Sequence, residues 1–270
     1  MTMISYAQNG EDVVLSRLFR RDEGFYVDVG AHDPVHLSVT KHFYDRGWRG
    51  INVEPAPDSF AALCAGRPRD INLNLGVSDR EGVMDFYESP AASGWSTFNK
   101  QHADNLRARG LEVHTKRISV STLADVFRKY VDRPIDFLKV DAESHEYEVL
   151  SGGDWRRWRP RVVLVESGPA PAWEPLLLEA GYLFALFDGI NRFYVSSEES
   201  GLLSGLEAGA NFMDDYVPYA HRLQLDEYRA RLAAFDGLTP RAAACARRVQ
   251  RVCRGVPGLP WLLRKIIPAA

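Results

Sequence analysis

Short apolar segments alternate with segments of helical spacing over the first part of this 270-residue chain. Four of the apolar segments predict buried strands, and the third in order, which carries two asparagines, predicts a strand. They are GFYVDVGA (24–31), GINVEP (50–55), INLNLGVS (71–78), PIDFLKVDA (134–142) and PRVVLVES (160–167). Helices are expected between them, with Asp58 or Ser59 and Ser121 as N-caps. The alternation predicts a mainly parallel sheet with helices on both faces.

Two later apolar segments end this pattern differently. YLFALFD (182–188) and NRFYVSS (191–197) flank a Gly-Ile-Asn turn, which predicts an antiparallel hairpin. An added antiparallel strand is expected at GVMDFYES (82–89), and an irregular polar loop over 90–112. A doubly wound, mainly parallel, seven-stranded Rossmann-like sheet that ends in an antiparallel hairpin resembles the layout of class I methyltransferases. In such sheets, ligands lie beyond the carboxyl ends of the strands.

Charge and cysteine content exclude several classes of protein. The formal net charge is −3, so the whole chain has no nucleic-acid signature. Cys64, Cys245 and Cys253 are odd in number and lack CxxC spacing, which argues against a disulfide framework and suits a reducing compartment. The first residues lack the apolar core of a signal peptide, and no apolar run is long enough to cross a membrane. A soluble cytoplasmic protein is therefore expected.

The turn DVGAHDP (28–34) indicates which nucleotide would bind. It keeps only Gly30 of the glycines that bring backbone N–H groups to a pyrophosphate, and Asp33 would repel phosphates. S-adenosylmethionine has no phosphate and carries a sulfonium and an ammonium, so this acidic turn favours it over NAD. An NAD-dependent sugar enzyme is also disfavoured because no Tyr-x-x-x-Lys pair follows the fourth strand.

Glu54 ends the second predicted strand, where an acid accepts hydrogen bonds from both hydroxyls of a ribose. Asp28 lies near the end of the first strand and is the second acid of this region. The alternative is that Asp28 and Glu54 are solvated acids at strand ends.

Eight segments over residues 5 to about 195 together resemble the FkbM-type S-adenosylmethionine-dependent methyltransferases. They are SYAQNGEDVVL, FYVDVGAHDP, SVTKHFYDRGWRGINVEPAP, NLGVSDREG, GWSTF, DFLKVDAESHEYEVLSG, RPRVVLVES and EPLLLEAGYLFALFDGINRFYV. The resemblance implies O-methylation of a hydroxyl on a sugar, a glycan terminus or a natural product. Together with the strand-end rule, it implies cofactor contacts from Gln8, Glu11, Asp28, Gly30, Ala31, Glu54, Pro55, Ser78 and Asp141.

The chain departs from this family in two places. The family commonly has glycine after its acidic Asp-x-Glu motif, whereas this chain has Ser144 followed by His145. The segment SGPAPAW after Glu166 is also shorter than the usual loop. Both places flank the expected acceptor pocket, so the identity of the acceptor is not carried over.

Methyl transfer to a hydroxyl requires removal of its proton by a His or carboxylate base, or activation by a divalent cation. Asp141, Glu143 and His145 are the catalytic candidates, and His145 is the sharpest base candidate because histidine titrates near neutrality. The alternatives are that Asp141 is a helix N-cap and that His145 is a surface residue. Glu146 and Glu148 are expected on a solvated helix face.

Two further sets of side chains are candidates around the same site. Asp141, Glu143 or Glu166, with His145 or His32, would suit magnesium or manganese, although no fixed-spacing motif requires a metal. Acceptor contacts are expected from His32, His36, Trp95, Ser96, Thr97 and Glu166. Trp95 could stack on a sugar ring or an adenine; the alternative is a loop anchored by one buried tryptophan.

The chain is expected to divide into a methyltransferase domain over 1–200 and a helical, basic extension over 201–270. From Thr239 onward the sequence contains no acid and many arginines among apolar residues. Such a segment can lie on an anionic membrane surface, which would suit lipid-linked glycans at the inner face of the membrane. The alternative is a helix that packs on the domain or on a second copy of the chain.

These observations predict an O-methyltransferase that acts on a sugar hydroxyl in a glycan or lipopolysaccharide pathway. One alternative is a tailoring methyltransferase for a small natural product. Another is a non-catalytic module that keeps the fold for binding, against which the acids Asp28, Glu54 and Asp141 argue.

Overall fold

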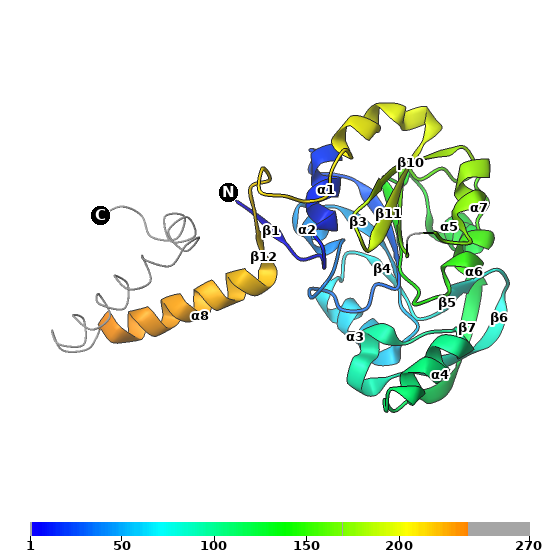
Figure 1. Ribbon diagram of the computed structural model, residues 1–270, viewed down its shortest axis with the longest axis horizontal. Helices are drawn as coiled ribbons and strands as arrows, with labels where there is room; N and C mark the ends of the chain where they lie inside the picture. The colour runs from blue at the N-terminus through cyan, green and yellow to red at the C-terminus, as the bar shows by residue number, and fades with distance from the viewer. Residues whose placement is uncertain (1, 169, 237–270) are drawn as a thin grey trace. The chain divides into compact units, whose positions relative to one another are not determined.

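The computed structural model describes residues 2–168 and 170–236 of the chain (Figure 1). It divides into two compact units, Met1–Pro218 and Tyr219–Ala270. The basic segment from Thr239, with its expected membrane or helix contacts, lies outside the described residues. No helix among the described residues has both the length and the apolar character needed to cross a membrane.

A seven-stranded sheet forms the centre of the first unit, in the order β10-β11-β9-β8-β2-β3-β4. Its strands are β2 (Phe25–Val29), β3 (Arg49–Val53), β4 (Ile71–Leu73), β8 (Phe137–Val140), β9 (Val162–Glu166), β10 (Tyr182–Phe187) and β11 (Asn191–Ser196). The first five pair in parallel, and β11 pairs antiparallel with both β9 and β10. The predicted α/β sheet with a terminal hairpin is therefore confirmed.

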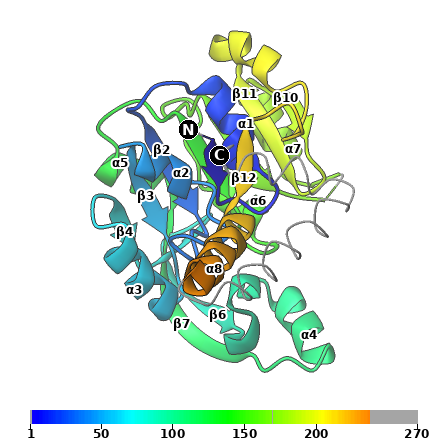
Figure 2. The same ribbon diagram turned by 90° about the vertical axis from the view of Figure 1, so that its left-hand side faces the viewer.

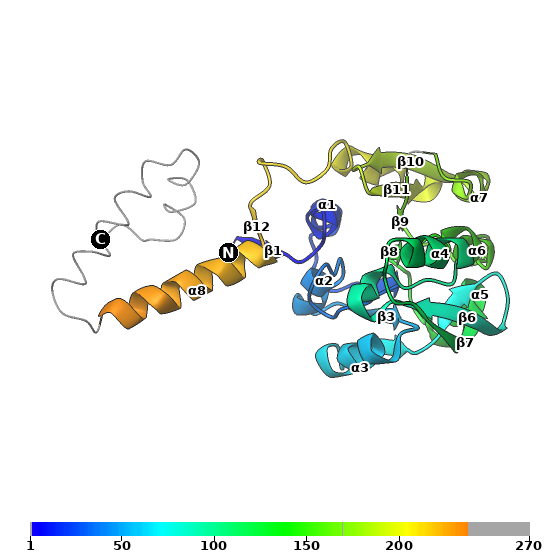
Figure 3. The same cartoon turned by 60° about the horizontal axis from the view of Figure 1, so that its bottom comes forward.

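Helices cover both faces of this sheet (Figure 3). Val27 and Leu138 point into one core, which α5 (Leu123–Tyr130), α6 (Glu146–Ser151) and α7 (Glu174–Glu179) complete. Tyr26 and Phe137, the neighbours of those two residues, point into a second core with α1 (Glu11–Leu18) and α2 (Lys41–Asp45). Because successive strand residues point to opposite faces, two cores require the uninterrupted apolar strands seen in the sequence.

A smaller three-stranded sheet, in the order β5-β7-β6, corrects part of the expected layout. Its strands are β5 (Gly76–Ser78), β6 (Gly82–Glu88) and β7 (His114–Thr122), so the strand predicted over 71–78 is in fact two strands in two sheets. Together with helix α4 (Lys100–Ala108), it lies at the opposite end of this unit from β10 and β11 (Figure 2).

The loop predicted over 90–112 is wrong for much of its length. A 3-10 helix, η1 (Pro90–Trp95), is followed by α4 (Lys100–Ala108). The side chain of Asn99 caps α4 by accepting a hydrogen bond from the backbone N–H of His102, and Ala103 and Leu106 are buried. A cap and two buried positions suffice for a short helix that otherwise has a polar sequence.

Two predicted helix caps are also wrong. Thr122, not Ser121, caps α5 by accepting from the backbone N–H of Asp125. The N-cap position of α3 (Pro57–Gly66) is Ala56, which makes no side-chain cap, so neither Asp58 nor Ser59 has that role.

The first unit extends past residue 200, where the domain was expected to end. After η2 (Ser197–Gly205), strand β12 (Tyr216–Pro218) pairs in parallel with β1 (Met3–Ser5). Arg17 binds Asp214 and the carbonyl oxygen of Ala208, which ties this stretch to α1. In the second unit, the structure describes helix α8 (Tyr219–Asp236).

Candidate functional site

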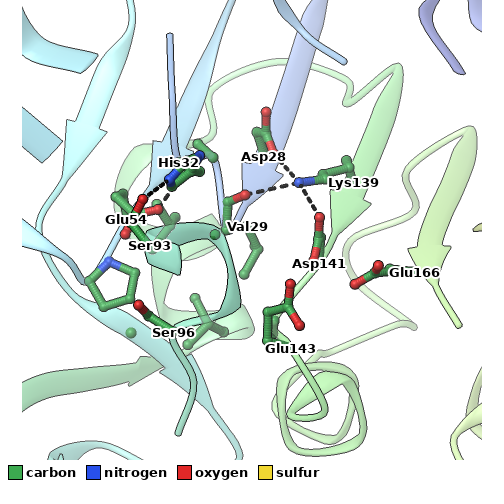
Figure 4. Close-up of a pocket in the computed structure, with 18 of the residues that line it drawn as sticks. Asp28, Val29, His32, Glu54, Ser93, Ser96, Lys139, Asp141, Glu143 and Glu166 are labelled. Carbon is green, nitrogen blue, oxygen red and sulfur yellow. Dashed lines mark hydrogen bonds and ion pairs between the residues drawn. The ribbon is translucent and has the colours of Figure 1, made fainter. Parts of the chain in front are cut away.

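A cleft lies at the carboxyl ends of the parallel strands, where Gly30, Glu54, Asp141 and Glu166 follow or end β2, β3, β8 and β9 (Figure 4). The predicted site residues that line it are Gln8, Asp28, Gly30, Ala31, His32, His36, Glu54, Pro55, Trp95, Ser96, Asp141, Glu143 and Glu166. Glu11, Ser78, Thr97 and His145 do not line it. Most of the predicted set is therefore brought together by strand ends that are distant in sequence.

Gly30 shapes the turn at the centre of the cleft. Its φ is 77°, and a Cβ there would collide with the carbonyl oxygen of Asp141. The backbone N–H groups of Gly30 and Ala31 donate to the carbonyl oxygen of Val53. This turn therefore packs against the ends of both neighbouring strands, an approach that only glycine permits.

Lys139 lies on the floor of the cleft, and sequence reasoning missed it. Its Nζ lies 3.4 Å from Asp28 Oδ1 and 3.2 Å from Asp141 Oδ2, and it donates to the carbonyl oxygen of Gly30 at 2.9 Å. Burial opposes its charge, but Asp141 and Asp28 outweigh burial and raise the pKa of Lys139. The signal was present in the sequence as a lone lysine inside the buried strand FLKV.

Glu54 joins the turns that follow β2 and β3. One carboxylate oxygen accepts from the backbone N–H of His32 at 2.8 Å, and the other accepts from that of Ala56 at 2.8 Å. Burial nevertheless raises the pKa of Glu54 to about 7. Each oxygen keeps a second lone pair, so the carboxylate can still accept hydrogen bonds from a ligand.

Asp141, Glu143 and Glu166 form an acidic trio, with one oxygen from each lying within 4.8 Å of the others. Burial and the nearby Asp141 raise the pKa of Glu143 to about 8 and that of Glu166 to about 9. Asp141 is also desolvated, but Lys139 outweighs this effect and lowers its pKa. At neutral pH the trio therefore holds an ionised Asp141 beside two carboxyls that readily carry protons.

The expected metal set is only partly assembled. The three carboxylates of the trio are close enough to share a cation, but His145 does not join them and Lys139 already binds Asp141. The metal expectation stays a prediction.

His145 lies behind the site rather than in it. It is 4% exposed, its Nε2 lies 3.2 Å from Ser78 Oγ, and its ring packs beside Phe98. Helix α6 begins at Glu146, and its N-cap position is His145, so Asp141 is not the N-cap. The bond to Ser78 directs the His145 ring toward β5. The proposed base and the proposed cofactor contact Ser78 thus bond to each other away from the cleft.

Glu146 does not lie on a solvated face, contrary to the prediction from sequence. It is 9% exposed, and its Oε1 accepts from the backbone N–H groups of Ala142 and Ser144. The loop that it holds contains two left-handed residues, Glu143 (φ 51°) and Ser144 (φ 74°). Glu146 therefore stabilises the strained loop that carries the acidic trio's Glu143.

The segment 93–99 forms the outer wall of the cleft. Trp95 is 47% exposed at the mouth, so it is not a buried anchor. Ser93 bonds to the ring of His32 at 2.9 Å. Thr97 is buried and donates to the carbonyl oxygen of Glu143 at 2.6 Å, so it holds the loop instead of facing a ligand.

Glu11 is a neighbour of the site that serves its backbone. Its carboxylate accepts from the backbone N–H of Asn9 and from the side chain of Asn191. These bonds fix the loop that brings Gln8 into the cleft.

S-adenosylmethionine fits the groups present. Leu75, Val77, Phe86 and Phe98 provide an apolar wall, which sequence reasoning missed because these residues come from the smaller sheet and its loops. Glu54 offers paired acceptors for two hydroxyls, and the remaining acids suit positively charged groups. The residues would repel the phosphates of a dinucleotide.

A family model and a curated relative both identify this chain as similar to methyltransferases. A family model described as methyltransferase FkbM domain matches residues 28–184. A curated relative, Methyltransferase sdnD of Sordaria araneosa, is 31% identical over 194 residues, which cover 58% of this chain and 73% of the relative.

Two solved structures show a more distant likeness. A methyltransferase FkbM from Methylobacillus flagellatus KT has a TM-score of 0.41 and 16% identity, over 67% of this chain and 47% of that one. A precorrin-6y C5,15-methyltransferase from Geobacter metallireducens GS-15 has a TM-score of 0.34 and 15% identity, over 70% and 87%. This chain thus spans about half of the first of these proteins.

Proposed function

This chain belongs to the FkbM methyltransferase family, and from that premise we propose that its cleft binds S-adenosylmethionine and methylates a hydroxyl of a sugar or glycan. The charge of the cleft carries the proposal. Five acidic side chains, those of Asp28, Glu54, Asp141, Glu143 and Glu166, line the cleft beside one buried ammonium group, that of Lys139. Asp141 is ionised, and a cationic ligand favours ionisation of Glu143 and Glu166 as well. Such a cleft favours a ligand with cationic groups and no phosphate.

The cofactor side is built from residues that the strand ends hold rigidly. Glu54 accepts the ribose hydroxyls, and the wall that includes Val77 and Phe98 takes the adenine. When bound, S-adenosylmethionine supplies a methyl group already activated by its sulfonium, so the protein mainly aligns the acceptor and removes its proton. Asp141, kept ionised by Lys139, favours positive charge beside that reaction.

Glu143 is the general base in this proposal. Its carboxylate lines the cleft and points toward Asp141 and Glu166 (Figure 4). Its pKa of about 8 lies close to neutrality, and a general base is most effective when its pKa is near the pH at which the reaction runs. The role of Glu143 is to accept the proton of the acceptor hydroxyl; with the cofactor bound, the methyl–sulfur bond would break and S-adenosylhomocysteine would be the leaving group.

The acceptor side is open and partly aromatic. Trp95 at the mouth offers a ring face to a sugar, and Ser96, His32 and His36 offer hydrogen bonds to hydroxyls. Leu37 is 61% exposed beside the same mouth. An apolar rim of this kind favours a second candidate, a tailoring enzyme for a hydrophobic natural product that carries a hydroxyl.

Calorimetry and a methyl-transfer assay test the proposal. We expect S-adenosylmethionine and S-adenosylhomocysteine to bind, and NAD not to bind. Turnover is then measured over a panel of methyl glycosides, oligosaccharides and hydroxylated polyketides. No binding of either methionine-derived ligand would leave a non-catalytic module; turnover only of polyketides would favour the second candidate. A rate that EDTA abolishes would replace the base route by a metal route.

A further inference from the structure

Helix α4 brings a histidine to the back of the acidic trio. His102 Nε2 lies 3.8 Å from Glu143 Oε2, and His102 Nδ1 lies 3.2 Å from Ser144 Oγ. The Nε2 atom is buried, yet at its present distance from Glu143 it has no hydrogen-bond partner among the residues that the structure describes. A buried ring nitrogen that faces a catalytic carboxylate is the unexplained feature of this region.

The placement of this histidine is fixed from both sides. Asn99 accepts from the backbone N–H of His102, and its side-chain nitrogen donates to the carbonyl oxygen of Ser144 at 2.9 Å. Thr97, two residues before, donates to the carbonyl oxygen of Glu143. The start of α4 and the loop that carries Glu143 therefore hold each other in register.

Ser144 occupies a backbone conformation that favours glycine. Its φ is 74°, and a non-glycine residue in that region costs about 1–2 kcal/mol. The hydrogen bonds that Glu146 accepts from the backbone N–H groups of Ala142 and Ser144 help to hold the loop in this form. Glycine would relieve the backbone but would supply no hydroxyl. Among the described residues, the contact of that hydroxyl with His102 is thus what the serine adds.

We propose that Ser144 and His102 are positioning residues for Glu143. The hydroxyl of Ser144 donates to Nδ1 of His102, which places the ring proton on Nε2. The Nε2–H then donates to Glu143 and orients its carboxylate toward the acceptor hydroxyl. The 3.8 Å separation closes to hydrogen-bond length when the acceptor is bound, as catalytic hydrogen bonds often do. This inference rests on the proposed function.

The surrounding charges agree with a neutral histidine. Desolvation and then Arg109 lower the pKa of His102, so the ring is uncharged at neutral pH and has one proton to place. Glu143 faces Asp141, Glu146 and Glu166, which disfavour its ionised form, and Lys139, which favours it. A donor from His102 adds to the effect of Lys139. The proton of the acceptor goes to Glu143, and His102 keeps its own.

The tautomer of His102 is measured directly by ¹⁵N NMR of the ligand-free protein at pH 7.5. The His102→Gln variant assigns the signal. We expect the wild-type Nδ1 to be unprotonated and Nε2 protonated, and Ser144→Ala to reduce that preference. A proton on Nδ1 in the wild type would overturn the proposal, and so would an unchanged spectrum in Ser144→Ala.

Kinetics on the best methyl glycoside of the panel separate positioning from folding. His102→Leu should lower kcat about 10- to 100-fold, within the about 10²–10⁴-fold that a base contributes, and leave the KM for S-adenosylmethionine within about twofold. His102→Gln keeps a donor near Nε2 and should recover most of the loss. Gln101→Ala, on the exposed side of α4, is the matched control.

Equal losses in His102→Leu and His102→Gln, or unchanged kcat in His102→Leu, would overturn the positioning role. Ser144→Gly adds a second discrimination. It should raise the melting temperature, because glycine adopts the positive φ at position 144 without strain, while it lowers kcat. A fall in both would mean that the serine is only structural. The proposed function has a separate test: it fails if the wild-type protein does not bind S-adenosylhomocysteine. The NMR result on the ligand-free protein does not depend on that binding.

Discussion

The ammonium group of Lys139 lies 3.2 Å from a carboxylate oxygen of Asp141 on the floor of the cleft. The same group reaches Asp28, so one cation serves acids from two neighbouring strands. Removing one partner of a buried ion pair leaves an uncompensated charge and typically costs about 3–5 kcal/mol. Lys139 therefore stabilises both the strand ends and the ionised form of Asp141.

Lys139→Met should lower the free energy of unfolding by about 3 kcal/mol because Asp28 and Asp141 lose their counter-charge. Urea denaturation measures this change, and calorimetry should show weaker binding of S-adenosylhomocysteine. Lys129→Met, at an exposed position of α5, is the control. Equal stability of the two variants would contradict the role of Lys139.

Glu54→Gln should weaken the binding of S-adenosylmethionine and of S-adenosylhomocysteine by the same factor, because both ligands carry the ribose. Glutamine has only one acceptor oxygen, so either His32 or Ala56 loses the partner of its backbone N–H, at a cost of about 1–3 kcal/mol. Calorimetry with both ligands checks this, with the exposed Asp58→Asn as control. If Glu54→Gln weakened the binding of only one of the two ligands, Glu54 would not contact the ribose that they share.

The ligand-free protein should lose stability as the pH rises from 6.5 to 9. Glu143 and Glu166 have pKa values of about 8 and 9 in the folded protein and near 4.5 when unfolded, so the folded state binds more protons over this window. The loss is about 3 kcal/mol after allowance for solvent screening. Melting temperatures across this range measure it, and a rising melting temperature would refute the assignment.

The same carboxyls should make cofactor binding depend on pH. S-adenosylmethionine carries one positive charge more than S-adenosylhomocysteine. Its affinity relative to that of S-adenosylhomocysteine should therefore increase between pH 7 and 9, as Glu143 and Glu166 ionise. Calorimetry with both ligands at several pH values gives the ratio of the two affinities. A constant ratio would show that the trio lies far from the bound sulfonium.

Glu146→Ala should loosen the loop of Glu143, because two backbone N–H groups lose their acceptor. We expect a loss of about 2 kcal/mol in stability and a fall in kcat, whereas Glu146→Gln keeps an oxygen and should retain most of both. Thermal unfolding and kinetics check this. Tyr147→Ala, from the exposed face of α6, is the control and should change little. An equal effect of Glu146→Ala and Tyr147→Ala would contradict the role of Glu146.

The sheet and the place of the cleft follow from local patterns. Each buried strand is apolar because two cores lie against it, and the acids that end parallel strands must meet at one edge. Gly30, Glu54 and Asp141 could therefore be predicted before any contact was known. The family resemblance added Gln8, which local patterns alone would not place.

The roles within the acidic stretch could not be predicted in this way. Asp141 and His145 are four residues apart, yet one lines the cleft and the other is buried behind it. The left-handed conformations of Glu143 and Ser144 turn the chain between them, and these depend on contacts with Glu146 and Thr97. The chemistry of histidine suggested His145 for the site, and a helical reading of the stretch put Glu146 in solvent; the structure contradicts both.

His102 was missed for a related reason. The segment 90–112 is polar and shows no strong periodicity, so it predicted a loop. Its helix forms because Asn99 caps it and because Ala103 and Leu106 find a buried surface. Only the assembled structure brings this segment to Glu143, from which it is separated by two strands and a helix in the sequence.

The outer wall of the cleft docks on backbone atoms. Thr97 and Asn99 donate to the carbonyl oxygens of Glu143 and Ser144, and every residue type has such an oxygen. The residues that face the mouth, such as Trp95, make no part of that attachment. Phe98 belongs to the proposed adenine wall and Ser93 bonds to His32, so exchange is confined to mouth residues such as Trp95 if the cofactor half is to stay unaltered. If the proposed function holds, a library confined to residues 90–96, with Ser93 kept, is the direct way to change the acceptor.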